Sequence, residues 1–276
     1  MGCKNTSLSN YKQNLHTHTT FCDGKDSPEE LVTEALARGF DSLGFSMHSF
    51  MRSRSADPEK LSAYKAEILH LKEKYKDDID VFLGIEYEPW TDFPTSGFEY
   101  TIAAVHYLAT ADGYKTFDVG LDGTLSFVDK YFEGDSYKFA KKYYETLGEL
   151  HKYGSFDIIA HFDIITKNNE LKSFIDTDEK RYVDLVLEAA DALSGKIPLF
   201  EVNTGAMARG YRTSPYPSLP ILKELRSRGF GAVISSDCHN KNYLDYAFDD
   251  ARELLLTAGF TSKFILTDNG FMEIAL

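Results

Sequence analysis

The chain has 276 residues, and its hydrophobic content of 43% is enough for a large buried core, which excludes a disordered protein. Its formal net charge of -13 opposes binding to nucleic acid and to anionic membranes, so we expect neither as a partner. No apolar run approaches the ~18 residues of a membrane span. The polar start of the chain, Met1 to Asn14, has no signal peptide, and Cys3, Cys22 and Cys238 form no CxxC pair. These features predict a cytoplasmic protein.

Short apolar runs alternate with helical periodicity from one end of the chain to the other. This alternation is typical of βα units around a parallel sheet. The expected strands are Gln13–His16, Ser42–Met47, Asp80–Ile85, Glu99–Val105, Phe156–Ala160, Pro198–Val202 and Gly231–Ser235, with a further β-rich stretch at Lys263–Leu266. The length suits one α/β barrel, and no flexible linker interrupts the pattern, so we expect a single domain, residues 1–276.

Helix signals fill the segments between these strands. Ser27-Pro28-Glu29-Glu30 is a capping box with proline at the first helical position. Later apolar stripes predict helices that begin near Asp57, Phe139, Asp176 and Leu244. Gly39, Gly229 and Gly259 each follow a helical pattern and precede a β-rich run, which predicts a positive φ at each helix end.

Two connections are longer than usual for a barrel. One runs from Tyr107 to Asp135 and is rich in aromatic residues, and the other runs from Thr204 to Ser218 and contains Arg209 and Arg212. Long loops on a rigid scaffold commonly carry function. We expect the first to cover a site and the second to contribute side chains to it.

The histidines are distributed unevenly along this pattern. Of the 8 histidines, His70 and His151 lie in helical patterns and are expected on solvated helix faces. The others lie at or just past the ends of predicted strands: His16, His18, His48, His106, His161 and His239. Because parallel strands of a barrel end at one rim, where active sites form, these side chains are expected to meet.

Three carboxylates join the same rim: Asp23, Glu86 and Asp237. In an extended chain residues i and i+2 point the same way, so His16 can act with His18, and Asp237 with His239. Nine candidate ligands exceed the three or four that one zinc ion needs, which indicates two or three divalent ions, bridged by Glu86 or Asp237. Imidazole with carboxylate favours zinc, iron or manganese. Cys22 and Cys238 are interpreted as small buried hydrophobes.

Positively charged residues follow two of the strand ends. Arg209 and Arg212 lie in the loop after Glu201, and Lys167 comes shortly after His161. Arginine suits bidentate recognition of phosphate, so all three are candidates for binding a phosphate ester. For each arginine, an ordinary solvated loop position remains an equal alternative.

Six segments in order carry a family resemblance: His16-Thr17-His18 with Asp23-Gly24, Met47-His48-Ser49, Gly84-Ile85-Glu86, Val105-His106-Tyr107, Ala160-His161-Phe162-Asp163 and Ser236-Asp237-Cys238-His239-Asn240. Together they resemble the polymerase and histidinol phosphatase (PHP) family. The resemblance implies a distorted (β/α)7 TIM-like barrel with a trinuclear metal centre. It implies one ion held by His16, His18, Glu86 and Asp237, a second by Glu86, His106 and His161, and a third by Asp23, His48 and His239.

Within that family, the loop Asn203 to Arg212 and the segment His161 to Lys167 are similar to those of histidinol-phosphate phosphatases. This resemblance implies hydrolysis of L-histidinol phosphate to L-histidinol and inorganic phosphate in histidine biosynthesis, by a metal-bridging hydroxide. Asp237, Glu86 and His239 are the expected catalytic residues, and a small phosphate ester is the expected partner. The sequence leaves the oligomeric state open.

Three alternatives remain at this point. The same centre could act on another small phosphomonoester or on a nucleotide 5′ end. A hydrolase of carbon–nitrogen bonds would need a bridging lysine, and no lysine lies at a predicted strand end. A barrel that only stores metal would have no need of arginines suited to phosphate beside the ions.

Overall fold

The computed structural model describes residues 11–51, 54–55, 58–91, 94 and 96–276. Cys3 and most of the segment from Met1 to Asn14 lie outside the described residues. Asp57, where a helix is predicted to begin, also lies outside them. These three predictions therefore stay as predictions.

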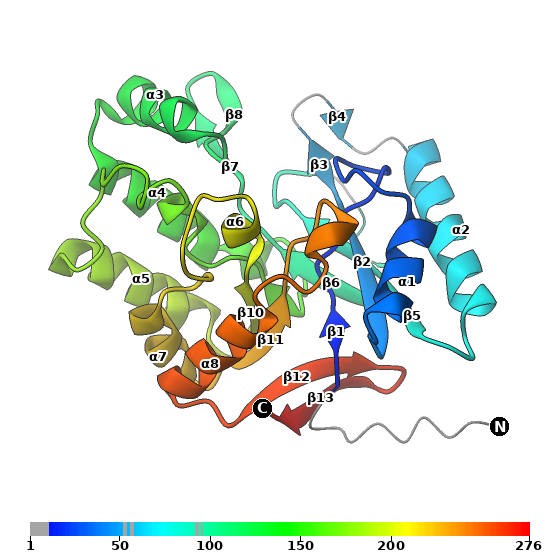
Figure 1. Ribbon diagram of the computed structural model, residues 1–276. Helices are drawn as coiled ribbons and strands as arrows, with labels where there is room; N and C mark the ends of the chain where they lie inside the picture. The colour runs from blue at the N-terminus through cyan, green and yellow to red at the C-terminus, as the bar shows by residue number, and fades with distance from the viewer. Residues whose placement is uncertain (1–10, 52–53, 56–57, 92–93, 95) are drawn as a thin grey trace.

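Within the described residues, seven strands form one parallel sheet in the order β1-β2-β5-β6-β9-β10-β11, at the centre of Figure 1. Their bounds are Gln13–Asn14, Ser42–His48, Asp80–Tyr87, Tyr100–Ala103, Ile158–Ile159, Leu199–Asn203 and Gly231–Ser235. All seven correspond to expected strands, although β1, β6 and β9 are shorter than predicted. The expected α/β architecture with a distorted seven-stranded barrel is confirmed.

The first and last strands of the sheet approach each other where the barrel closes. Thr17 forms a parallel bridge with Cys238. The amide of His18 donates to the carbonyl of Cys238 at 2.8 Å, and the amide of Cys238 donates to the carbonyl of His16 at 3.1 Å. The closure therefore fixes the His16–His18 segment directly against the segment that carries Asp237 and His239.

Helices pack around the outside of this barrel (Figure 1). Their bounds are α1 Pro28–Ala37, α2 Pro58–Lys74, α3 Leu121–Phe132, α4 Ser136–Gly148, α5 Lys180–Leu193, α6 Gly205–Ala208, α7 Leu219–Ser227 and α8 Phe248–Ala258. Short 3-10 turns follow at Leu150–Lys152, Ile164–Thr166 and Lys241–Tyr243. Among the helices described, none is long and apolar enough to cross a membrane.

Local sequence signals set several of these helix ends. The Ser27 side chain accepts from the Glu30 amide and the Glu30 side chain accepts from the Ser27 amide, so the predicted capping box is confirmed. Gly39, Gly229 and Gly259 have φ values of 69°, 81° and 92°, as predicted. The prediction that Asp176 caps a helix is wrong. That carboxylate accepts from the amide of Asp178 in a turn, and α5 begins at Lys180.

The long connection after β6 is more structured than the sequence indicated. It contains the hairpin β7 Tyr107–Thr110 and β8 Gly113–Thr116, followed by α3. The ring of Phe117 packs at 5.3 Å from Phe139 of α4, and Phe127 packs at 5.8 Å from the same ring. Most aromatic residues of this connection thus build core under α3 and α4. The expectation that they cover a site is wrong for them.

A C-terminal hairpin closes the barrel end where the strands begin (Figure 1). The predicted β-rich stretch is strand β12, Ser262–Thr267, which pairs antiparallel with β13, Gly270–Ala275. Leu266 is 3% exposed and packs in one apolar cluster with residues inside the barrel, including Phe82 and Leu199. The side chain of Gln13 hydrogen-bonds both backbone groups of Leu266, at 2.9 and 2.8 Å. This end is consequently apolar and well bonded.

Candidate metal centre

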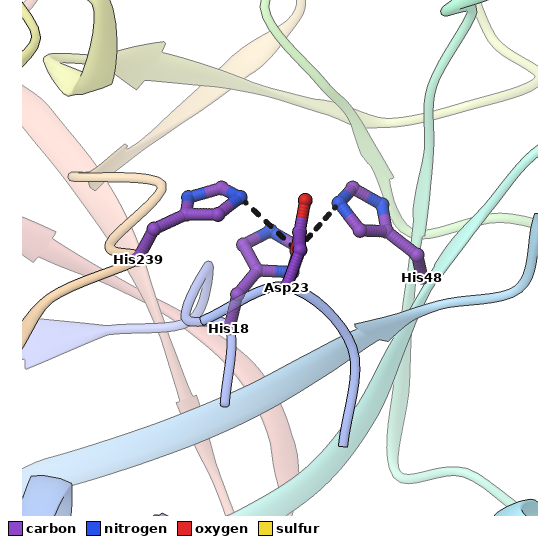
Figure 2. A group of neighbouring side chains, drawn as sticks. All are labelled: His18, Asp23, His48 and His239. Carbon is purple, nitrogen blue, oxygen red and sulfur yellow. Dashed lines mark ion pairs between the residues drawn. The ribbon is translucent and has the colours of Figure 1, made fainter. Parts of the chain in front are cut away.

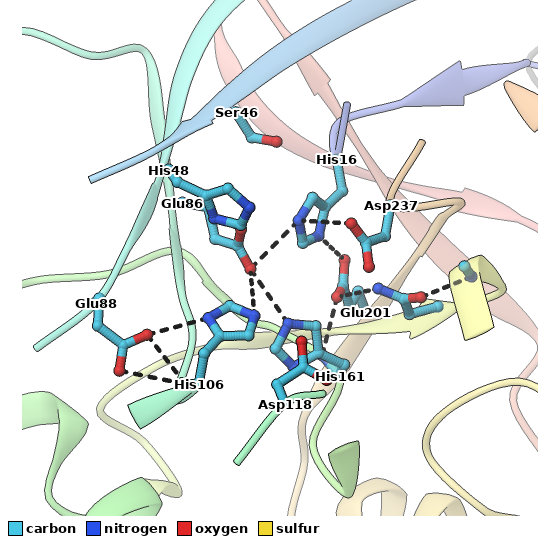
Figure 3. Close-up of polar contacts among 12 residues, drawn as sticks. His16, Ser46, His48, Glu86, Glu88, His106, Asp118, His161, Glu201 and Asp237 are labelled. Carbon is cyan, nitrogen blue, oxygen red and sulfur yellow. Dashed lines mark hydrogen bonds and ion pairs between the residues drawn. The ribbon is translucent and has the colours of Figure 1, made fainter. Parts of the chain in front are cut away.

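Glu86, near the end of β5, lies at the middle of the opposite rim (Figure 3). Its Oε1 lies 3.2 Å from His161 Nε2, 3.4 Å from His16 Nε2 and 3.5 Å from His106 Nε2. Its Oε2 lies 2.7 Å from His48 Nδ1. Imidazoles at the end of β2 and just past the ends of β1, β6 and β9 therefore converge on a single buried carboxylate.

Asp237 adds a second carboxylate to this group. Its Oδ1 lies 3.2 Å from His18 Nε2 and 3.5 Å from His16 Nε2. Ligands about 2.0–2.1 Å from a tetrahedral zinc ion lie about 3.3–3.5 Å from one another, which these spacings match. Among the described residues, no partner hydrogen-bonds the buried Nε2 atoms of His16 and His18. Since buried polar atoms normally have partners, these two lone pairs fit a bound cation.

A neighbouring group lies on the solvent side of the first (Figure 2). Asp23 Oδ1 lies 3.3 Å from His239 Nε2 and 3.4 Å from His48 Nε2, and the rings of His48 and His239 each lie 4.2 Å from that of His18. Their ligand atoms all lie within 4.8 Å of one another. His16, His18 and Glu86 form a second such group, and His48, Glu86 and His106 form a third. Each of these groups could hold a metal ion.

The histidines of the rim differ in protonation. Although burial opposes it, the nearby carboxylates raise the pKa of His16 and of His48 well above the usual value and that of His106 to about 9, so a metal ion would have to displace protons from these three rings. Burial, together with the charges of His48 and His239, lowers the pKa of His18 to about 3, so this imidazole is neutral at pH 7. Burial alone would raise the pKa of Glu86, but the charges of His16, His48 and His106 hold it well below its usual value. Neutral imidazole and ionised carboxylate are the forms that ligate metals.

The backbone is strained at two residues of the rim. His161 has a φ of 21° and Asp237 a φ of 47°, both in a region that L side chains rarely adopt. Such conformations cost on the order of 1–3 kcal/mol each and persist where the surroundings enforce them. Here the His161 amide donates to Glu201 Oε1 at 2.9 Å, and the Asp237 carbonyl accepts from Arg209 at 3.1 Å. Strain held in this way is typical of functional sites.

A cavity of about 440 Å³ opens over the rim. Its lining combines candidate ligands with residues of the two long connections and of the turn after His161: Asp23, His48, His106, Tyr107, Thr116, Asp118, Ile164, Lys167, Arg209, Asp237 and His239. Arg209 donates to Asp237 Oδ2 at 2.9 Å and lies 3.3 Å from His239 Nδ1. Gly205 makes this placement possible, because a Cβ there would lie 2.9 Å from Arg209 Nη2. The cavity thus joins the candidate metal groups to two cations suited to an anion.

A family model described as the PHP domain matches residues 14–205, which include all but two of the nine candidate ligands. This chain belongs to the PHP domain family.

Relatives named for one activity match nearly all of this PHP chain. A Deinococcus radiodurans protein named "Probable histidinol-phosphatase" is 28% identical over 264 residues, which cover 90% of this chain and 95% of that protein. A Bacillus subtilis protein named "Histidinol-phosphatase" is 23% identical and is covered to 97%, against 86% of this chain.

A solved structure from Lactococcus lactis shares the fold of this PHP domain. It superimposes with a TM-score of 0.73 at 20% identity and covers 95% of this chain and 98% of that one. Its description is histidinol phosphate phosphatase complexed with Zn, L-histidinol and phosphate. At this identity the likeness establishes the fold of the PHP domain.

Two carboxylates that sequence reasoning missed stand behind the histidines of the PHP rim (Figure 3). Glu201 Oε2 lies 2.8 Å from His16 Nδ1, and Glu88 Oε2 lies 3.0 Å from His106 Nδ1. A carboxylate on Nδ1 fixes the ring and leaves Nε2 for a metal. A signal for Glu201 exists in the sequence, because it is the one charged residue within an otherwise uncharged strand, Leu199–Asn203.

Not every predicted site residue lies at the cavity. The Arg212 side chain is 7% exposed, donates to Thr166 Oγ1 at 2.6 Å and packs 4.3 Å from the centre of the Tyr216 ring. It does not line the cavity, because these contacts turn it into the protein. Lys167 does line it, but its Nζ is paired with Asp118 Oδ1 at 2.7 Å.

The residues given a structural interpretation behave mostly as expected. His70 is exposed, whereas His151 is partly buried and its Nδ1 lies 3.0 Å from the Gly148 carbonyl. Cys238 is 1% exposed and packs in an apolar cluster. Cys22 is partly buried against the same cluster, with its Sγ 3.4 Å from His18 Nδ1. Neither thiol belongs to a group that could hold a metal ion.

Proposed function

We propose that this PHP domain is a metal-dependent phosphomonoesterase that hydrolyses L-histidinol phosphate to L-histidinol and inorganic phosphate. The observation that carries the proposal is one cavity whose lining includes members of two candidate metal groups together with Arg209 and Lys167, while the third group shares His18 and Glu86 with those two. Imidazoles and carboxylates supply sites for divalent cations, and the two side-chain cations supply contacts for an anion. The names of the relatives, and the L-histidinol and phosphate in the Lactococcus structure's description, support this substrate.

The candidate ligands divide into sites for two or three divalent ions. His16, His18, Glu86 and Asp237 would hold one ion, Glu86, His106 and His161 a second, and Asp23, His48 and His239 a third. The donor set favours zinc, iron or manganese. Bound ions of this kind would supply Lewis acidity and acidify water, both of which promote in-line hydrolysis of a phosphomonoester.

The other cavity residues would bind and orient the ester. Arg209 presents its guanidinium beside Asp237 and His239, where it can bind phosphoryl oxygens and neutralise the charge that develops on them. Its bonds to Asp237 also hold that carboxylate toward His16 and His18. Asp237, Glu86 and His239 thus remain the proposed catalytic residues. Arg212 holds the Thr166 turn in place and becomes a positioning residue in this scheme.

The direct test is phosphate release by the purified protein before and after removal of its metal. We expect rapid release from L-histidinol phosphate, loss of at least about 10³-fold on exhaustive chelation, and recovery when zinc, iron or manganese is added back. Elemental analysis of the same samples gives the ions per chain. A rate that survives complete removal of metal would exclude the scheme.

A matched pair of arginine variants tests the anion site. Arg209→Ala removes the guanidinium from the cavity, and we expect a loss of about 10²-fold or more in kcat/KM with the metal content kept. Arg226→Ala, an exposed residue of α7, is the control and should behave as wild type. A panel of small phosphomonoesters and short 5′-phosphorylated oligonucleotides decides the substrate. A better rate on one of those than on L-histidinol phosphate would replace the proposed substrate.

A further inference from the structure

The wall of the cavity contains a further carboxylate, Asp118, beside His161 (Figure 3). Asp118 follows β8 and lines the cavity with Thr116 of that strand and Tyr107 of β7. Among the described lining residues, the other two carboxylates, Asp23 and Asp237, lie at the candidate metal groups. Asp118 belongs to none of the candidate metal groups found among the described residues. An anion there opposes a phosphate ester unless the ester also carries a positive charge.

Asp118 is held in a fixed position. The next residue toward β8, Phe117, is 2% exposed and packs against Phe139 and Tyr143, so the backbone is anchored in the core. The Asp118 amide donates to Thr116 Oγ1 at 3.1 Å. Its Oδ1 accepts from Lys167 Nζ at 2.7 Å. Fixed placement of this kind is what recognition of one substrate group requires.

The second oxygen of Asp118 is available. In the part of the chain that the structure describes, no donor hydrogen-bonds Oδ2, and the side chain is 23% exposed toward the cavity. Burial alone would raise the pKa of Asp118, but the charges of Lys167 and His106 and the hydrogen bond from Lys167 keep it below its usual value. The group is therefore an anion at neutral pH and an acceptor for a cation.

We propose that Asp118 is a specificity-determining residue, whose free carboxylate oxygen receives the ammonium group of an amino-alcohol phosphate. This inference rests on the proposed phosphatase function and deepens it by assigning a residue that recognises the amine of the substrate. Lys167 and Arg209 would face the phosphate, and Asp118 would face the amine of the leaving alcohol. The ammonium of such an ester lies only a few bonds from its phosphate, which fits a carboxylate that shares a cavity with both cations.

A simpler role for Asp118 is to neutralise Lys167, and the two roles predict different kinetics. A partner of Lys167 alone would affect every phosphate ester equally. A receptor for the amine would affect only esters that carry one. The ratio of kcat/KM between two esters that differ only in the amine therefore separates them.

The experiment compares L-histidinol phosphate with the same ester lacking its amine, 3-(imidazol-4-yl)propyl phosphate. We expect wild type to prefer the amine ester at least tenfold in kcat/KM. Asp118→Asn, which keeps the shape and an acceptor for Lys167, should reduce this preference at least tenfold, chiefly through KM. Lys167→Met should lower both rates together and keep the preference. Melting temperature and metal content check that each variant is folded and loaded.

Three results would overturn the inference. If Asp118→Asn lowers kcat/KM by the same factor on both esters, Asp118 is only a partner of Lys167. If the wild-type protein hydrolyses both esters equally well, Asp118 does not recognise the amine, and no variant is needed to show it. The proposed phosphatase function would still stand. A wild type that releases phosphate from neither ester, yet releases it from p-nitrophenyl phosphate, removes the proposed substrate and this inference with it.

Discussion

The two ends of this barrel are built from the same strands and have opposite chemistry. At the rim where strands end, imidazoles and carboxylates crowd together, and the backbone is strained at His161 and Asp237. Three buried ring nitrogens there have no hydrogen-bond partner among the described residues. At the other end the β12–β13 hairpin covers an apolar cluster, and Gln13 satisfies the backbone of Leu266. Stability and function are thus separated along the barrel axis. The strained and polar rim is tolerated because the rest of the barrel is well packed.

If this separation holds, each end fails in its own way, and the largest effect is expected at Glu86. Glu86→Gln keeps the size of the side chain and removes the charge on which five histidines converge. We expect kcat/KM to fall by about 10³-fold or more, because several kcal/mol of ion-dependent stabilisation are lost. The rate of phosphate release and the metal content measured by elemental analysis should fall together, while the chain remains folded.

Glu99→Gln is the matched control for that variant. Glu99 is also a carboxylate beside the sheet, but it accepts from the Leu83 amide at 2.8 Å, far from the histidines along β5. It should keep wild-type metal content and rate. Full metal content and rate in Glu86→Gln would contradict the placement of the ion sites at this rim.

The closed end should show the converse. Leu266→Ala leaves a hole in the apolar cluster under the barrel, and we expect the free energy of unfolding to fall by about 2–4 kcal/mol. Metal content and kcat at temperatures well below melting should stay at the wild-type level. Urea denaturation of the metal-loaded protein measures the loss of stability.

Met272→Ala on the same hairpin is the control for Leu266. Met272 is 36% exposed, so its truncation removes little buried surface and should cost much less. If Leu266→Ala remains folded but binds less metal than wild type, the two ends are not independent. Packing at the hairpin would then set the geometry of the rim.

What the sequence could reveal follows the same division. The strands and the rim histidines were predictable, because buried strands have a clear apolar signature and the ends of parallel strands meet at one rim. Glu86 was recognisable at the end of its strand. The roles of Glu88, Glu201 and Asp118 were not, because each depends on a partner 18 to 185 residues away in the chain. No local pattern reports such a contact.

The arginines illustrate the limit most clearly. Arg209 and Arg212 lie three residues apart in one loop and looked equivalent in the sequence. Gly205 and the short helix α6 bring Arg209 to Asp237, whereas Tyr216 and Thr166 hold Arg212 inside the protein. Which arginine faces the cavity is decided by packing of the loop, and composition contains no signal for it.

The smallest effect we predict tests how far the polar rim extends into the barrel. Glu201 lies between the two ends, 1% exposed, and accepts from the His161 amide, the Asn203 side chain and the Ser235 hydroxyl while it faces His16 Nδ1. Glu201→Gln places an amide N–H₂ where donors already point. We expect metal affinity or kcat/KM to fall by about 10- to 100-fold, the usual cost of losing a carboxylate behind a metal-bound histidine.

Ser235→Ala sharpens that result, because it removes one donor to Glu201 and leaves the charge that faces His16. Ser235→Ala should lower the metal affinity less than Glu201→Gln does. Titration of the metal-free proteins with zinc measures both affinities. If the two variants cost the same, the hydrogen-bond network as a whole would matter more than the carboxylate. If Glu201→Gln lowers stability but leaves zinc affinity unchanged, Glu201 belongs to the structural end of the barrel, and the boundary between the two ends lies closer to the histidines than we infer.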